Sequence, residues 1–201
     1  MLANLVTLLR MPFLGVILLL LYGPSPTGRL VAAPLIVLLI LMDTLDGILA
    51  RSRGEASIVG SVLDIAADRA VEYVLWTVFA HLRLIPVLIP ILVLLRGTFV
   101  DALRSVAPAQ GLKPFDLMRS PLGRFLVGSP WLRASYAVVK AVAFTLLAAT
   151  HALQTGGHPW ASPLLTAARG AAWLGLSFCL LRGIPVLIEG PKVLRDLQDE
   201  V

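Results

Sequence analysis

Two pairs of aspartates lie inside apolar stretches of this sequence. Asp43 and Asp46 are three residues apart near the end of one stretch, and Asp64 and Asp68 are four residues apart in the next. At these spacings each pair lies on one face of a helix, and a short connection between the two helices lets the faces meet. Ionisable groups are costly inside a membrane span, where they mark a polar cavity or a partner.

Four carboxylates in a low-dielectric setting repel one another unless they bind protons or cations. Oxygen ligands without a nearby Cys or His favour hard ions such as Mg²⁺ or Mn²⁺. Two such ions, roughly 3.5–4 Å apart, could bridge the carboxylates and clamp both phosphates of a diphosphate. We therefore predict a site for two Mg²⁺ or Mn²⁺ ions, formed by Asp43, Asp46, Asp64 and Asp68.

Small residues share the faces that carry the aspartates. Gly47 and Gly60 leave room for a nucleotide or for another backbone. Arg51 adds a guanidinium whose forked donors suit a phosphate. A structural polar network, or the proton relay of a transporter, is the alternative interpretation of the aspartates.

Long apolar helices are the elements that must hold these side chains. The chain has 201 residues, of which 58% are hydrophobic and only 14% charged, and a membrane-spanning helix takes roughly 20 apolar residues. Six segments have this length and character: Leu5–Tyr22, Leu30–Arg51, Ser57–Ala80, Leu84–Val106, Ala134–Leu153 and Leu164–Ile188. We predict an all-α integral membrane protein, a six-transmembrane-helix bundle that forms one domain over residues 1–201.

Basic residues indicate the orientation of this bundle. Lys and Arg gather after the second, fourth and sixth spans, whereas the opposite loops hold Arg29, Arg83 and Arg169. By the positive-inside rule, both termini and the active site face the cytoplasm, and we expect a multi-pass protein of a prokaryotic cell membrane. Because the bases lie at membrane boundaries, they favour anionic lipid or a phosphorylated substrate as partners over nucleic acid.

The segment Ala107–Arg133 is the longest polar stretch, and its four prolines exclude one continuous helix. We expect substrate-specific contacts there, because its bases exceed what a neutral alcohol needs. Positive-inside topology alone is the alternative explanation for these loop bases. The residues predicted to bind a phosphorylated acceptor are Asp101, Arg104, Lys113, Arg119 and Lys140.

The pattern resembles the motif of the CDP-alcohol phosphatidyltransferases, which it matches without departure. The matching residues are Asp43-x2-Asp46-Gly47-x2-Ala50-Arg51-x8-Gly60-x3-Asp64-x3-Asp68. The segment from Asn4 through Thr7 to Arg10 is also similar to the opening common in these enzymes, although an ordinary helix start explains it equally well.

This resemblance implies a mechanism. Asp43, Asp46 and Asp64 would bind metal, and Asp68 would join them while acting as general base toward the acceptor hydroxyl. The donor would be CDP-diacylglycerol, CMP would leave, and the lipid product would stay in the membrane. The resemblance also implies a homodimer. The residues that it places against the CDP portion are Gly47, Arg51, Gly60 and Thr7.

The acceptor alcohol is less constrained by the sequence. Arg96-x7-Arg104-x6-Gly111 is similar to a stretch of the phosphatidylglycerophosphate synthases, which favours glycerol 3-phosphate. Gly97, however, stands where that subgroup often has an acidic residue. An inositol phosphate is the second choice of acceptor. A small ion-coupled transporter and a catalytically silent scaffold are the competing classes of protein.

Overall fold

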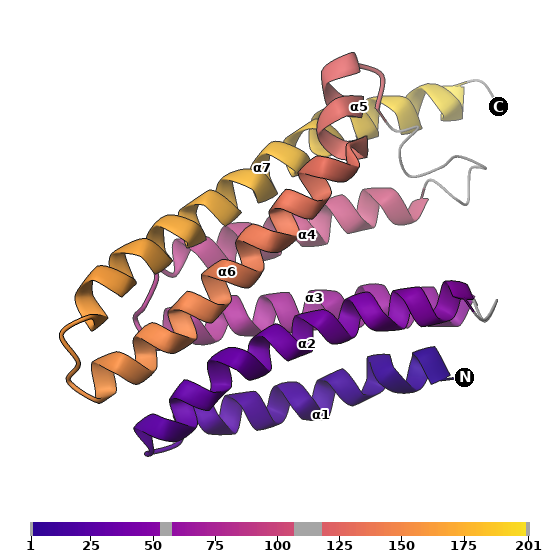
Figure 1. Ribbon diagram of the computed structural model, residues 1–201. Coiled ribbons are helices and arrows are strands. Elements are labelled where there is room, and N and C mark those ends of the chain that lie inside the picture. Colours follow the sequence, from indigo (N-terminus) through magenta and orange to yellow (C-terminus); the bar gives the residue numbers. More distant parts are fainter. Residues whose placement is uncertain (1, 53–57, 107–117, 200–201) are drawn as a thin grey trace. The chain divides into compact units, whose positions relative to one another are not determined.

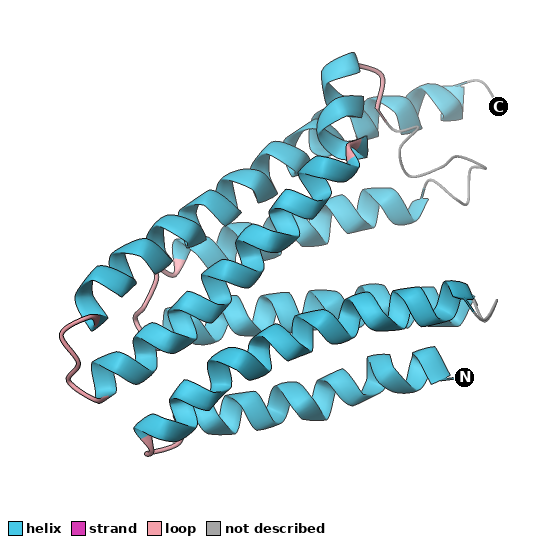
Figure 2. Ribbon diagram, viewed as in Figure 1, coloured by secondary structure: helices cyan, strands magenta, loops and turns pink. Residues whose placement is uncertain are grey.

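The structure is a computed structural model. It describes the backbone of residues 2–52, 58–106 and 118–199, and the side chains of 8–42, 60, 62–106 and 118–196. Within these ranges the chain forms seven helices and no strand, as Figures 1 and 2 show. The helices are α1 (Leu2–Tyr22), α2 (Pro26–Ser52), α3 (Ile58–His81), α4 (Leu88–Val106), α5 (Pro121–Gly128), α6 (Pro130–Thr155) and α7 (Ala161–Asp199).

The six long helices coincide with the six predicted spans, but α5 and the end of α7 were not predicted. Pro121 is the first residue of α5 and Pro130 the first of α6, where proline is tolerated because the first helical N–H groups lack partners in any case. The polar stretch is thus divided by its prolines, as expected. In α7 the helix continues 11 residues past Ile188, since Val193 and Leu194 pack into a hydrophobic core.

Membrane crossing is supported by helix length and composition. Among the described residues, two helices are long and apolar enough to cross a bilayer, Pro130–Thr155 and Ala161–Asp196. The described parts of α1 and α2 contain shorter apolar helices, Leu8–Tyr22 and Pro26–Met42. The all-helical architecture is therefore confirmed, while the count of six spans remains a prediction.

Contacts divide the chain into two compact units. The first consists of Met1–Val87 and Ala141–Ala172, and the second consists of Leu88–Lys140 and Trp173–Val201. Helices α6 and α7 contribute to both units, so neither unit is a continuous segment.

In the first unit, α1 contacts both α2 and α3. The buried face of α1 carries Leu14, Ile17 and Leu21 at the helical spacings of three and four. Arg10 lies one turn before Leu14 on the same face and is only 1% exposed. The buried face of α1 therefore includes one positively charged side chain, Arg10.

Two arginines of the predicted extracytoplasmic loops bind backbone carbonyls at helix ends of this unit. Arg29 donates through Nε to the carbonyl oxygen of Gly23 at 2.9 Å, and through Nη1 to Thr155. Arg169 donates to the carbonyl oxygen of Leu84 at 2.7 Å. Gly23 and Leu84 lie in the connections that follow α1 and α3, where backbone carbonyls need partners from outside a helix, so these arginines have a structural role at the ends remote from the aspartates.

Candidate active site

Two of the four motif aspartates have described side chains, and both contact Arg10. Arg10 Nη1 lies 3.7 Å from Asp64 Oδ1, and Arg10 Nη2 lies 3.8 Å from Asp68 Oδ1. The arginine side chain is 2% exposed, whereas the carboxylates are 48% and 45% exposed. The guanidinium therefore lies beneath two acids that face outward.

The helical period explains this placement. Gly60, Asp64 and Asp68 follow at intervals of four on α3, so they share one face. The buried residues Ala67 and Val71 each follow one of these aspartates by three residues, so they lie about 60° around the helix from Asp64 and from Asp68, respectively. The carboxylates consequently flank the packed side of α3 and are half-exposed instead of buried.

The other half of the predicted metal site belongs to α2. Asp46 lies six residues before the end of α2 and Asp64 six residues after the start of α3, so each is about 9 Å of helix from the connecting segment 53–57. The backbone is helical at Asp43, Asp46, Gly47 and Arg51, but their side chains, like that of Thr7, lie outside the described residues. The described geometry thus covers Asp64 and Asp68 alone.

The chemistry of the donor set fits a hard divalent cation. Asp64 and Asp68 present carboxylate oxygens four residues apart on a half-exposed face, and such oxygens are the ligands that Mg²⁺ and Mn²⁺ prefer. Within the described side chains, no group of three or more His, Cys, Asp or Glu residues is placed to hold a metal. The predicted four-aspartate set therefore stays a prediction.

The second unit contains a group of cations that we call the cationic cluster: Lys140 of α6 and Arg182 of α7, which lie beside the Tyr136 ring, and Arg96 of α4 and Arg133 of α6, which lie near Arg182. Lys140 Nζ lies 4.7 Å from the centre of the Tyr136 ring, and Arg182 Cζ lies 5.9 Å from it. Arg96 and Arg133 are close enough to Arg182 for their positive charges to repel its guanidinium group. The cluster gathers positive charge beside Tyr136, whose ring attracts the nearest cations through cation–π interactions.

Two arginines of this cluster are buried. Arg96 is 7% exposed and Arg182 is 9% exposed, and their Nε atoms make no hydrogen bond within the described part of the chain. A Cβ atom on Gly183 would lie 2.5 Å from Cγ and Nε of Arg96, so this glycine allows the arginine to cross α7 closely. Buried guanidinium groups require an anionic or hydrogen-bonding partner. The arrangement suits a phosphate.

Helix α5 is fixed to α7 by one carboxylate. Glu189 Oε2 accepts from the backbone N–H groups of Arg119 at 2.7 Å and Ser120 at 3.0 Å, and Oε1 accepts from the Ser120 hydroxyl. Ser120 Oγ in turn accepts from Gly123 N at 2.9 Å and caps the helix. An anion at the N-terminus of a helix satisfies its unpaired donors and its dipole.

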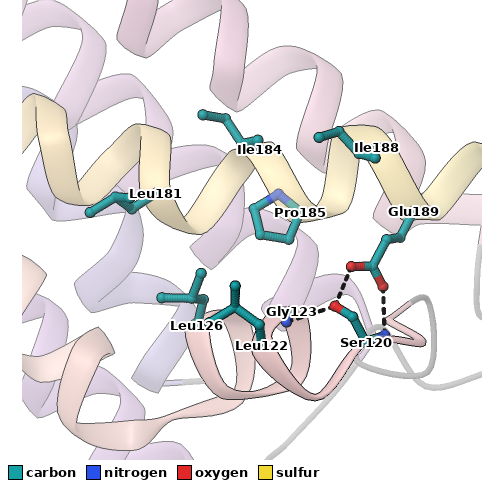
Figure 3. A pocket seen from close by; sticks show the side chains of 9 residues that line it. All are labelled: Ser120, Leu122, Gly123, Leu126, Leu181, Ile184, Pro185, Ile188 and Glu189. Carbon is teal, nitrogen blue, oxygen red and sulfur yellow. Dashed lines mark hydrogen bonds between the residues drawn. The ribbon is translucent and has the colours of Figure 1, made fainter.

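An apolar pocket of about 270 Å³ lies between α5 and α7, as Figure 3 shows. Leu122 and Leu126 line it from α5, and Ile184 and Ile188 line it from α7. Glu189 and Ser120, which it binds, stand at one end of the pocket. We call this contact between Glu189 and the start of α5 the α5 anchor, and the polar lining of the pocket is confined to it.

The predicted acceptor residues all belong to the second unit. Asp101 and Arg104 are partly buried on α4, and Lys140 belongs to the cationic cluster. Arg119 forms a 2.6 Å ion pair with Asp196, which gives it a structural partner beside the α5 anchor. Lys113 lies outside the described residues.

Arg182 is the cluster member that sequence reasoning missed. It lies inside the sixth predicted span, six residues before its end, where an ionisable residue is a signal for a functional site. Arg96 was noticed only as part of a subgroup motif. The same rule that singled out the aspartates would have found both arginines.

The fold and the site define an all-α protein whose charged groups, the aspartates with Arg10 in the first unit and the cationic cluster in the second, are set among apolar helices. The sequence pattern of the CDP-alcohol phosphatidyltransferases matches residues 1–147, and the chain belongs to this family. The prediction of the family, and of an enzyme of that class, is thereby confirmed.

Among curated relatives, the chain is similar to proteins named phosphatidylinositol phosphate synthase from Mycobacterium tuberculosis and Mycobacterium bovis. Identity is 34% over 95 residues, which cover 44% of this chain and 44% of each relative. The alignment thus spans less than half the length of the relatives that it matches.

Proposed function

We propose that this protein transfers a phosphatidyl group from CDP-diacylglycerol to a phosphorylated alcohol and releases CMP. The observation that carries the proposal is the half-exposed pair Asp64 and Asp68, which lies within the segment that matches the family. The sequence favours glycerol 3-phosphate as acceptor. The name of the relatives favours an inositol phosphate, and we take an inositol phosphate as the acceptor to test first.

The metal-binding residues of this proposal are Asp43, Asp46, Asp64 and Asp68, with two Mg²⁺ or Mn²⁺ ions. Bound there, divalent ions supply stabilisation of the negative charge on the diphosphate. Asp68 takes the proton from the acceptor hydroxyl, and the resulting oxygen attacks the phosphorus on the lipid side of the donor, from which CMP departs. The residues that orient the CDP portion are Gly47, Arg51, Gly60 and Thr7.

The cationic cluster supports a phosphorylated acceptor. A phosphorylated acceptor would give the buried guanidinium groups of Arg96 and Arg182 a counter-ion, which is favourable in an apolar setting. A phosphate offers several acceptor oxygens and about two negative charges, which match forked arginine donors. The acceptor residues proposed from sequence remain Asp101, Arg104, Lys113, Arg119 and Lys140, and Arg182 and Arg96 join them.

We place this activity in a multi-pass protein of a prokaryotic cell membrane, with both termini and the active site in the cytoplasm, and working as a homodimer. Large apolar side chains are exposed on each of the six long helices, for example Leu19 of α1, Val62 of α3 and Phe99 of α4. Soluble monomers rarely leave so much apolar surface in water. These faces therefore support contact with lipid.

The reaction is tested by CMP release from CDP-diacylglycerol in detergent or nanodiscs containing Mg²⁺ or Mn²⁺. The acceptors compared are inositol phosphate, glycerol 3-phosphate, inositol and serine. We expect release with inositol phosphate, and its loss on chelation. Release with glycerol 3-phosphate alone would return the acceptor to the choice favoured by sequence.

A matched pair of variants tests the catalytic residue in the same assay. Asp68→Asn removes the proposed base and should lower turnover at least about 100-fold. Asp196→Asn, whose described ion pair is with Arg119, should retain most activity. Folded Asp68→Asn protein with wild-type turnover would refute the general-base assignment, and silence with every acceptor would refute the reaction class.

A further inference from the structure

Arg10 is the one cation that the described contacts place against the predicted metal ligands. It comes from α1, whereas both aspartates belong to α3, so the contact ties two helices together. The motif that carries the proposed chemistry does not include this residue. Its position raises the question of what a buried arginine does beside carboxylates that are expected to hold divalent ions.

The geometry of the contact is that of an ion pair without direct hydrogen bonds. The two separations, 3.7 and 3.8 Å, exceed the usual hydrogen-bond range of about 2.7–3.2 Å. Each of these contacts involves one oxygen of its carboxylate, and a carboxylate offers about four lone-pair sites. A cation can therefore bind the outward side of the acids while the guanidinium stays beneath them.

Charge provides the reason for this arrangement. Two carboxylates four residues apart on one helix repel each other, and the proposed metal site would add the charges of the second aspartate pair. Without a cation the site would oppose folding. A guanidinium buried beneath the acids offsets that repulsion, and each of its two terminal nitrogens approaches one carboxylate.

We propose that Arg10 is a built-in counter-cation of the metal site. It stabilises the metal-free protein by compensating Asp64 and Asp68, and its fixed positive charge weakens the binding of divalent cations at the same carboxylates. This inference rests on the proposed function. Arg10 is a positioning residue in this account, since it contacts the ligands and not the substrate.

The test measures Mn²⁺ binding and thermal stability instead of turnover. Free Mn²⁺ is followed by its paramagnetic resonance signal during titration, and the midpoint of thermal unfolding is measured in EDTA and in saturating Mn²⁺. The variant Arg10→Met removes the charge and keeps much of the side-chain volume. We expect it to bind Mn²⁺ about fivefold or more tightly, and to lose stability in EDTA but regain most of it with Mn²⁺.

Arg29→Met is the matched control. Arg29 belongs to the same unit and its described partners are Gly23 and Thr155. It lies 14 residues before Asp43 on α2, which is about 21 Å of helix. Its loss should lower the unfolding midpoint equally in EDTA and in Mn²⁺, with Mn²⁺ affinity unchanged.

The outcomes separate this inference from the proposed function. If the wild type binds Mn²⁺ but Arg10→Met binds it equally or more weakly, the counter-cation role is overturned and the metal site stands. If the wild type binds no Mn²⁺, the metal site and the role of Arg10 are both overturned. Should Arg10→Met fail to fold, Arg10→Gln keeps hydrogen-bond donors without the charge, and the same tightening is expected.

Discussion

Arg182 is the residue whose surroundings bear most directly on the acceptor. It is 9% exposed in a long apolar helix, beside Tyr136 and within electrostatic range of Arg96 and Arg133. An anion bound to this guanidinium would stabilise the protein, because a buried donor with incomplete hydrogen bonding costs free energy. The residue is therefore a direct probe of acceptor charge.

Arg182→Met should raise the KM for a phosphorylated acceptor at least about tenfold, because a charge-assisted hydrogen bond is worth about 1.5–3 kcal/mol. The KM for CDP-diacylglycerol should stay near the wild-type value. Arg195→Met, an exposed arginine of the same helix, is the control. Initial rates at varied acceptor and fixed donor measure the effect, and an equal rise in both KM values would argue against a specific acceptor contact.

The pattern of the aspartates can be read from the sequence because it lies within one short stretch of the chain. Their spacing within two adjacent helices is readable from about 26 residues. The cationic cluster is different, because Arg96 and Arg182 are 86 positions apart and only folding brings them together. Arg10 was similarly ambiguous, since its burial depends on α3, although its register with Leu14 and Ile17 was visible in the sequence.

At the scale of elements, α5 illustrates how a short helix is held by its first turn. Helices of eight residues are marginal alone, so α5 depends on its anchor to Glu189 and on the burial of Val127 against Val100 and Val186. Hydrophobic runs predict the long helices and prolines predict the breaks. No apolar run of sufficient length marks α5, which explains why it was not predicted.

Two glycines of α5 provide a paired test of the anchor. A Cβ atom on Gly123 would lie 2.8 Å from Glu189 Oε1 and 2.9 Å from Ser120 Oγ, whereas one on Gly128 meets nothing within 4 Å. Gly123→Ala should therefore destabilise the protein by about 1–3 kcal/mol, and Gly128→Ala should be neutral or slightly stabilising. Thermal unfolding in detergent measures both, and equal effects would show that the anchor is not tightly packed.

The whole molecule presents its apolar surface outward. The exposed large hydrophobic side chains occur on all six long helices, which is unfavourable in water but suits a hydrocarbon surrounding. Composition and helix length predict this character from sequence alone. The predicted number of crossings rests on the length of the apolar segments, and the predicted orientation rests on the distribution of Lys and Arg.

The exposed tryptophans can report how deeply different parts of the chain lie in the membrane. Trp131, at the start of α6, is 84% exposed, Trp160, just before α7, is 67% exposed, and Trp173 is 44% exposed about 18 Å further along α7. Tryptophan favours the two faces of a bilayer whose hydrocarbon core is about 30 Å thick. The first two indoles should therefore lie shallow and the third deep.

Quenching of tryptophan fluorescence in vesicles of brominated lipid would measure these depths. Bromine near the headgroup should quench Trp131 and Trp160 more strongly, and bromine near the chain ends should quench Trp173 more strongly. Trp131→Phe with Trp160→Phe should remove the shallow quenching, and Trp173→Phe the deep quenching. The opposite depth order would contradict the predicted spans. With the expected order, the intrinsic emission would measure how the protein responds when the thickness of its host membrane changes.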